Sequence, residues 1–233
     1  MGRRYEVDLT SAHPAANDMT KLTIYAVPAS LYCAKLRILL RHKGLDWREI
    51  PPPGGYGSDA YKNIVPSGNL PTLIDGGLLL SDSEAIAEYL NEKYPQPGML
   101  PSDPSARAKV RERSRFHDTR LEPEIRSLFR HLPGGEPITP ERARVSSSVL
   151  SARLTQLARI LENTPDAGTE LSLGECGFAV SFVWIDGIAP ALGLAIDWPS
   201  GILQYRKRLE ALPSIAAELI DYGPTVKEYL GCQ

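Results

Sequence analysis

The sequence predicts a mixed α/β domain followed by an all-helical domain. Up to about residue 97, short apolar segments of strand type alternate with helical patterns, whereas only helical patterns follow residue 104. A segment with four prolines and no periodicity, YPQPGMLPSDPSA, separates the two regions. The 233 residues are enough for two modest domains. We therefore expect an N-terminal extension at 1–19, an α/β domain at 20–97, a linker at 98–103 and a helical domain at 104–233.

The α/β region begins with a buried strand and a helix. KLTIYAV, from residue 21, is a short and mostly apolar run. In LYCAKLRILLRHKG, Leu31, Ala34 and Ile38 fall on one helical stripe, and Gly44 ends the pattern as a C′ stop. LDWREI is a second strand, and it leads into the Pro/Gly loop PPPGGYGS and a short helix around 59–63.

A hairpin and a third helix complete this region. PTLI and LLL are strands joined by Asp75-Gly76-Gly77, which is a strong hairpin signal. Ser81 and Glu84 have the spacing of a capping box, so we expect a helix to begin there and to continue through Leu90. The resulting order, β-α-β-α-β-β-α, is the pattern of a thioredoxin-like domain.

The second region contains only helical patterns. We expect one helix from about residue 105 to 132, ended by PGGEPITP, and a second over 141–162. Ser172 and Glu175 form another capping-box pattern, which opens the very apolar segment GECGFAVSFVWIDGIAPALGL. Two shorter helices, divided near Pro213, close the chain.

The composition excludes several classes of function. The formal net charge is −2 with both signs mixed, so we expect no nucleic-acid partner. No apolar run reaches the ~18–20 residues of a membrane span, and the first residues lack the apolar stretch of a signal peptide. Cys33, Cys176 and Cys232 lie far apart, which predicts neither a disulfide framework nor a metal site. We expect a cytoplasmic protein with no membrane partner.

Four motifs, in this order, carry a resemblance to a known family. They are SLYCAKLRILLRHKGLDW, VPSGNLPTL, LLLSDSEAIAEYL and the helix opened by Ser172 and Glu175. In order and spacing they resemble the cytosolic glutathione transferase superfamily from about residue 21 to 221. The resemblance implies an N-terminal thioredoxin-like domain and an all-helical C-terminal domain. It also implies glutathione as co-substrate, a small and hydrophobic electrophile as second substrate, a detoxification role and a homodimer.

The resemblance makes Ser30 the expected catalytic residue. Ser30 precedes a helix, so its hydroxyl and the following N–H groups can point at one anion, here the thiolate of glutathione. The alternative is that Ser30 has a purely structural role as the N-cap of the helix. Tyr32 and Tyr25 offer competing hydroxyls. Cys33 stands where the second thiol of a C-x-x-C redox pair would be, and we interpret it as a packing residue.

Five further residues are expected to bind glutathione. The Leu70-Pro71 bond should be cis, so that the Leu70 backbone pairs with the cysteinyl part of the peptide by strand addition. Asp82 would take the ammonium of the γ-glutamyl end and Ser83 its carboxylate. Asp82 stands where the family has Glu or Gln, and Asn69 where many members have a longer or charged side chain.

The second-substrate pocket is the least readable part of the sequence. The candidates lie on a helix that borders this pocket in the family: Arg113, Phe116, His117 and Arg120. A polar helix face of this kind is more often solvated or part of a dimer contact, so we assign no catalytic role to them. Trp184 and Phe182 are expected in the core. Two other functions remain open: glutathione-dependent isomerisation of a maleyl-type acid, as in the zeta class, and a non-catalytic binding or scaffold role. Against the zeta class, its S-S-C run is SLY here.

Overall fold

The structure is a computed structural model that describes residues 22–164 and 166–231. Its sheet contains β1 (Leu22–Tyr25), β2 (Trp47–Ile50), β3 (Thr72–Asp75) and β4 (Leu78–Ser81), in the order β2-β1-β3-β4. β1 and β2 are parallel, and the other two pairs are antiparallel. In the register, Tyr25 lies opposite Ile50 on one side and Thr72 on the other. The mixed sheet and the hairpin at Gly76, with φ of 58°, confirm the prediction.

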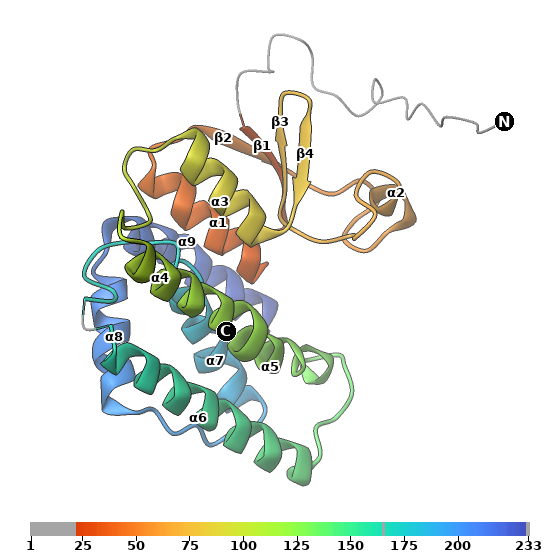
Figure 1. Ribbon diagram of the computed structural model, residues 1–233. Coiled ribbons are helices and arrows are strands. Elements are labelled where there is room, and N and C mark those ends of the chain that lie inside the picture. Colours follow the sequence, from red (N-terminus) through yellow and green to blue (C-terminus); the bar gives the residue numbers. More distant parts are fainter. Residues whose placement is uncertain (1–21, 165, 232–233) are drawn as a thin grey trace, which may run out of the picture.

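Three helices accompany the sheet: α1 (Leu31–His42), α2 (Asp59–Lys62) and α3 (Ser83–Lys93). α1 and α3 lie side by side on one face of the sheet, whereas α2 lies out on the opposite side (Figure 1). α1 ends as predicted, because Gly44 adopts a φ of 61° that side chains disfavour. This arrangement confirms the thioredoxin-like fold class of the first region.

The second region lies below the sheet in Figure 1, and its named elements within the described residues are all helical. Its elements are α4 (Pro104–Phe116), the π-helical turn η3 (His117–Leu121), α5 (Glu122–Arg126), the 3-10 turn η4 (Phe129–His131), α6 (Pro140–Glu162), α7 (Phe178–Ala191), α8 (Ser200–Glu210) and α9 (Pro213–Tyr229). The exact boundaries of the two domains stay a prediction, and the extension at 1–19 lies outside the described residues.

The single helix expected at 105–132 is wrong, because the segment breaks at a π-helical turn. Pro123 has no N–H group, so it cannot donate to the Thr119 carbonyl as a continuous α-helix requires. The Glu122 N–H instead donates to the His117 carbonyl five residues earlier. The extra residue in this turn rotates everything after it, including α5.

Both capping boxes differ from the prediction. Ser81 ends β4, and Asp82 caps α3 instead, with its carboxylate accepting from the N–H groups of Glu84 and Ala85 at 2.9 Å. Asp82 has a φ of 143°. Glu175 accepts from the Ser172 N–H at 3.1 Å as a box requires, but α7 begins only at Phe178. The second pair therefore stabilises the turn before its helix.

The two regions are held together mainly through α1, which packs against α9 and α7. Glu218 of α9 is buried and pairs with Arg37 at 2.6 Å and with Arg41 at 3.1 Å, both on α1. A buried charge needs partners of this kind, so α9 fixes α1 by electrostatics as well as by packing. None of the helices in the described residues is long and apolar enough to cross a membrane.

Candidate functional site

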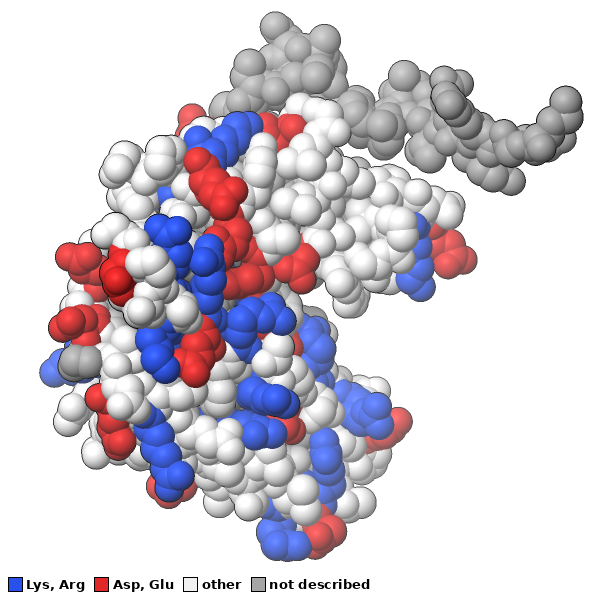
Figure 2. Space-filling view, in the orientation of Figure 1, with Lys and Arg blue, Asp and Glu red and all other residues white. Residues whose placement is uncertain are grey.

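A cavity of about 410 Å³ lies between the sheet-bearing half and the helices. The sheet-bearing half lines it with Val27, Ala29, Ser30, Leu31, Tyr32, Tyr56, Asn69, Leu70, Asp82 and Ser83. The helices line it with Arg115, Asp118, Arg126, Phe129, Trp184 and Tyr229. Five of the six residues expected at the site thus border one cavity, and Pro71 is buried beside it. In Figure 2 the molecule is hollowed between the lobe that carries α2 and the helices below.

Ser30 stands at the N-terminus of α1, where it caps the helix and borders the cavity. Its Oγ accepts a hydrogen bond from the Cys33 N–H at 3.3 Å, which is the capping role. Because Oγ acts there as an acceptor, its own proton remains available to an anion in the cavity. The N-terminal dipole of a 12-residue helix favours an anion at the same place.

The Tyr32 hydroxyl is already committed elsewhere. It donates to Glu122 Oε2 at 3.0 Å, on the helical side of the cavity. Burial, followed by the charges of Glu122 and Asp118, raises the pKa of Tyr32 well above its usual value. A phenol has one proton to donate, so this contact leaves Tyr32 without a donor for a sulfur anion. Tyr25 does not line the cavity: it is buried in β1, against the ring of Tyr61.

Cys33 is buried, as a packing residue would be. Burial raises the pKa of its thiol, although the Ser30 hydroxyl lowers it to a smaller degree. Cys176 is buried and also carries a free thiol, with a pKa that burial raises far above normal. Cys232 lies outside the described residues. Neither described cysteine has the exposed, thiolate-stabilising environment of a reactive one.

The backbone around Leu70 is arranged to meet an extended peptide. The Leu70-Pro71 bond is cis. The Asn69 carbonyl is held from behind by the hydroxyls of Tyr61 at 2.7 Å and Thr72 at 3.1 Å. The Leu70 N–H and C=O find no hydrogen-bond partner among the described residues, while Leu70 borders the cavity. These two groups are therefore free to pair with a ligand backbone.

Polar groups gather at the start of α3. One carboxylate oxygen of Asp82 caps the helix and the other has no partner within the described part of the chain. Asp82 is exposed and Ser83 half-buried, and both border the cavity at a helix N-terminus. This place can hold an ammonium against Asp82 and a carboxylate against Ser83 and the helix dipole. Asn69 is exposed and borders the cavity.

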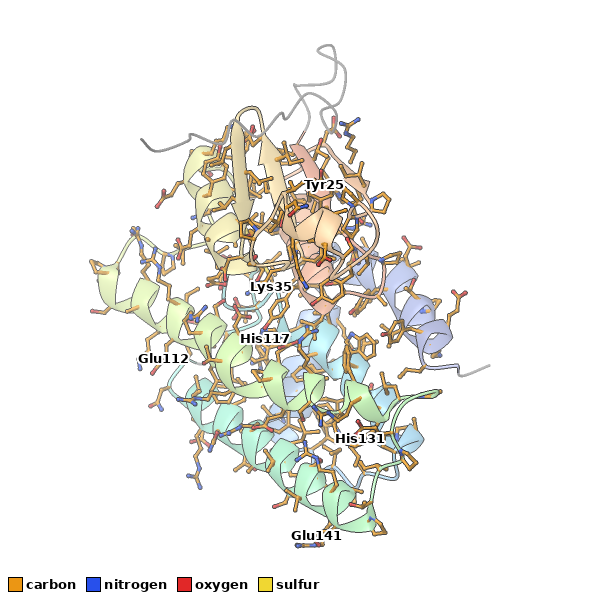
Figure 3. All side chains as sticks on the ribbon, turned by 90° about the vertical axis from the view of Figure 1, so that its right-hand side faces the viewer. Tyr25, Lys35, Glu112, His117, His131 and Glu141 are labelled. Atoms are coloured by element: carbon orange, nitrogen blue, oxygen red, sulfur yellow. The ribbon has the colours of Figure 1, made fainter. Side chains whose placement is uncertain are left out.

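Behind the cavity, a buried ion network joins the two halves. Lys35 Nζ of α1 contacts Glu84 Oε2 of α3 at 2.8 Å and both oxygens of Asp118 in η3 at 2.9 and 3.0 Å. Ser114 donates to the same Glu84 oxygen at 2.7 Å, and His117 Nδ1 lies 2.7 Å from Asp118. Figure 3 shows Lys35 and His117 at the junction of the sheet-bearing half and the helices. Sequence reasoning missed this network. The position of Lys35 on the apolar stripe of α1 was a signal for it, because a buried lysine needs acidic partners.

The helical wall differs from the residues that the sequence suggested. Arg113 is buried in a pair with Glu175 at 2.7 Å, and His117 is buried between Asp118 and Ser181. Neither they nor Phe116 and Arg120 line the cavity. Arg115, Arg126 and Phe129 do so instead. Arg126 and Phe129 follow the π-helical turn, which changes the face that the later residues point inward, whereas Arg115 precedes it.

Trp184 belongs both to the core and to the cavity wall. It is almost completely buried, as expected, yet it borders the cavity together with Phe129 and Tyr229. Its Nε1–H donates to Tyr222 Oη at 2.6 Å, and that hydroxyl donates to the Ala29 carbonyl at 3.1 Å. A short chain of hydrogen bonds therefore connects the aromatic wall to the loop that carries Ser30.

The structure thus combines a thioredoxin-like domain with a helical region, and a cavity between them is bordered by the N-terminus of α1 and the unpaired Leu70 backbone. Comparisons with known proteins, in sequence and in fold, identify the family. The family described as "Glutathione S-transferase, N-terminal domain" matches residues 24–98. Glutathione S-transferase 3 of Zea mays is 30% identical over 175 residues, which cover 70% of this chain and 77% of that protein. A Tau class glutathione S-transferase from mango, Mangifera indica, has a similar fold, with a TM-score of 0.76 at 17% identity over 91% of this chain and 97% of that one.

Two further relatives have different names. A stringent starvation protein A homolog of Pasteurella multocida is 32% identical over 167 residues, which cover 71% of this chain and 75% of that protein. Glutathione S-transferase Z2 of Arabidopsis thaliana is 37% identical over 116 residues, so the match spans 48% of this chain and about half, 52%, of that relative. The chain belongs to the cytosolic glutathione transferase superfamily, whose members use glutathione as co-substrate.

Proposed function

We propose that this protein is a glutathione transferase in which Ser30 stabilises the glutathione thiolate for attack on a small electrophile. Leu70, Asp82 and Ser83 would hold the peptide, with Pro71 shaping the edge and Asn69 at its glycyl end. The observation that carries the proposal is the contrast between two hydroxyls. Ser30 Oγ borders the cavity and accepts a bond at 3.3 Å, whereas the proton of Tyr32 is given to Glu122 at 3.0 Å.

The chemistry follows from this contrast. A free thiol is mostly protonated at neutral pH, and only the thiolate is a strong nucleophile. A hydroxyl that donates to sulfur stabilises the thiolate over the thiol, and the N-terminal dipole of α1 acts in the same direction. The protein then holds the sulfur beside the helical wall, where an electrophile would lie against Phe129, Trp184 and Tyr229.

The test compares Ser30→Ala with the matched variant Tyr32→Phe. Conjugation of benzylideneacetone with glutathione gives kcat, and titration calorimetry gives the affinity for glutathione. We expect Ser30→Ala to lower kcat by about 100-fold, the size typical of a lost oxyanion donor. Its affinity for glutathione should change by less than about threefold, and Tyr32→Phe should keep its kcat within that factor. A Ser30→Ala protein with full kcat would overturn the assignment.

A non-catalytic binding role is the second candidate, because one relative that matches most of the chain, the stringent starvation protein A homolog, does not have an enzyme's name. The same measurements separate the two roles. A binding module would take up glutathione in the calorimeter but give no conjugate with any electrophile offered. The unpaired Leu70 edge and the free oxygen of Asp82 argue for a retained glutathione site in either case.

The isomerase alternative has one structural observation in its favour. The cavity wall carries Arg115 and Arg126, which would suit a substrate with carboxylates. A zeta-type isomerase would convert a maleyl-type acid to its trans isomer without consuming glutathione, and ultraviolet spectroscopy of that conversion is the test.

We also propose that the domains are bounded at 20–97 and 104–233, and that the protein acts in the cytoplasm as a homodimer. Light scattering on a sizing column tests the dimer.

A further inference from the structure

Arg126 is one of the two arginines that line the helical wall of the cavity. It belongs to the last turn of α5, and its side chain is 43% exposed. Its guanidinium carbon lies 5.6 Å from the centre of the Tyr32 ring and 5.5 Å from that of Phe129. Two aromatic rings that line the cavity therefore flank the guanidinium and orient its planar fork.

Most N–H groups of the Arg126 guanidinium form no hydrogen bond within the described part of the chain. Nη2 contacts Glu122 Oε1 at 2.5 Å, and no hydrogen bond is formed there by Nε or Nη1. Arg115, the second arginine of the wall, is 54% exposed and approaches Asp118 only to 3.8 Å. Both arginines are permanently charged.

Asp118, the carboxylate that this wall presents to the cavity, already has other partners. Asp118 receives two bonds from Lys35 and contacts His117 at 2.7 Å. Although burial by itself raises it, the hydrogen bond from His117 and the charge of Lys35 hold the pKa of Asp118 far below its usual value. Glu122, which does not line the cavity, pairs with Arg126 itself and accepts from Tyr32 at 3.0 Å. An anion in the cavity would therefore meet cations with open donors rather than bare carboxylates.

The remainder of the wall is a connected aromatic surface. The ring of Trp184 lies 4.6 Å from that of Phe129 and 5.6 Å from that of Tyr229, and all three border the cavity. Such a surface favours a flat, aromatic ligand. Asp82, on the sheet-bearing side of the cavity, binds the ammonium of glutathione in the proposed function.

We propose that the second substrate is an aromatic carboxylic acid whose carboxylate binds Arg126 and whose ring packs on Phe129, Trp184 and Tyr229. This inference rests on the proposed function and names its substrate class. For an acid that carries an enone, the glutathione sulfur forms a bond to the β carbon. The alkene electron pair moves onto the α carbon as an enolate, which takes a proton from water. No atom is lost, and no external oxidant or reductant is needed.

The first experiment measures binding without reaction. The probes are para-carboxybenzylacetone, which is saturated and inert, and its methyl ester, titrated calorimetrically into the full-length protein. A charge-assisted hydrogen bond to a half-exposed arginine increases the affinity of a ligand about tenfold over one that lacks the bond. We expect the acid to bind about tenfold more tightly than the ester, and this preference to fall below about twofold in Arg126→Gln. Arg126→Lys keeps the positive charge but loses the planar guanidinium, so it should retain part of the preference for the acid.

Two further variants act as controls. Arg120→Gln removes an exposed arginine of the preceding turn that does not line the cavity, and it should keep the full preference. Glu122→Gln combined with Arg126→Gln removes both charges of the pair, and it should lose the preference just as Arg126→Gln does. The double variant excludes repulsion by a stranded Glu122 as the cause. Thermal melts establish that each variant is folded.

The second experiment repeats the comparison in turnover, with para-carboxybenzylideneacetone and its methyl ester, each rate divided by the uncatalysed rate with glutathione. Arg126→Gln should raise KM about tenfold for the acid only. If it instead raises KM for glutathione with both electrophiles, Arg126 holds the glycyl carboxylate of glutathione and the inference is wrong. Equal binding of inert acid and ester to the wild type also overturns it. Binding of the inert probes needs neither glutathione nor Ser30. The preference for the acid can therefore persist when the glutathione transferase proposal fails, and it can be absent when that proposal holds.

Discussion

Replacing Lys35 with methionine removes the ammonium that bridges Glu84 and Asp118 behind the cavity. Methionine has a similar length and suits a buried site, so the change removes charge with little change of volume. The lysine side chain is 3% exposed, and those of Glu84 and Asp118 are 12% and 9% exposed. The variant therefore leaves two nearly buried carboxylates without their shared cation.

The expected loss can be derived from this geometry. Removing one partner of a buried ion pair typically costs about 3–5 kcal/mol, because a charge is left uncompensated. Here Ser114 still donates to Glu84 at 2.7 Å, and His117 still contacts Asp118 at 2.7 Å. The remaining donors place the loss near the lower limit, at about 3 kcal/mol. Urea unfolding at pH 7, followed by circular dichroism, measures it.

The pH dependence gives an independent check of the cause. In the wild type, burial raises the pKa of Asp118, but His117 and Lys35 outweigh it and hold that pKa well below the unfolded value. The stability that Asp118 contributes is thus present above about pH 4 and is lost as the pH falls towards the folded pKa. Without Lys35 the folded pKa rises, so the deficit of the variant should shrink as the pH is lowered below about 4.

Lys109→Met is the matched control. Lys109 pairs with Glu112 at 2.8 Å on the surface of α4, where both side chains are more than half exposed. Such a pair contributes only about 0.2–0.5 kcal/mol. If Lys35→Met lost no more stability than Lys109→Met, or if its deficit did not depend on pH, the buried network would not hold the two halves together.

Three further predictions concern the site. Tyr222→Phe should lower stability by about 1–3 kcal/mol in urea unfolding, because the Trp184 N–H and the Ala29 carbonyl lose their partner; an unchanged midpoint would contradict this. Asp82→Asn should keep the cap, with less than about 0.5 kcal/mol lost, yet raise KM for glutathione about tenfold; steady-state kinetics showing an unchanged KM would remove Asp82 from the site. Cys33, buried and with a raised pKa, should react with iodoacetamide only on unfolding, and mass spectrometry revealing rapid native alkylation would refute its packing role.

Local patterns were enough for the sheet-bearing half. The period of apolar residues, Gly44 and the Asp75-Gly76-Gly77 turn are local signals, and each element they predict is present. The cap of α3 was misplaced by one residue. Both Ser81 and Asp82 are good caps, and the choice depends on the pairing of β4 with β3, which is not a local property.

Long-range contacts were not predictable in this way. The partners of Lys35 lie 49 and 83 residues along the chain, so no local pattern pairs them. The helical wall was misread for a geometric reason. The sequence predicts one continuous helix at 105–132, but the π-helical turn at 117–121 adds a residue and rotates α5, so that Arg126 reaches the cavity. Arg113 lies before this turn and is buried against Glu175, a partner 62 residues away that no local pattern indicates.

In the proposed mechanism, Ser30 lowers the pKa of the thiol of bound glutathione. The most direct measurement is the ultraviolet absorbance of the thiolate in the glutathione complex as a function of pH. For the wild type, we predict a midpoint well below the value of about 8.5 for a free thiol, and for Ser30→Ala a return towards that value. Tyr32→Phe should leave the midpoint unchanged. A midpoint that is the same in wild type and Ser30→Ala would show that Ser30 does not stabilise the thiolate.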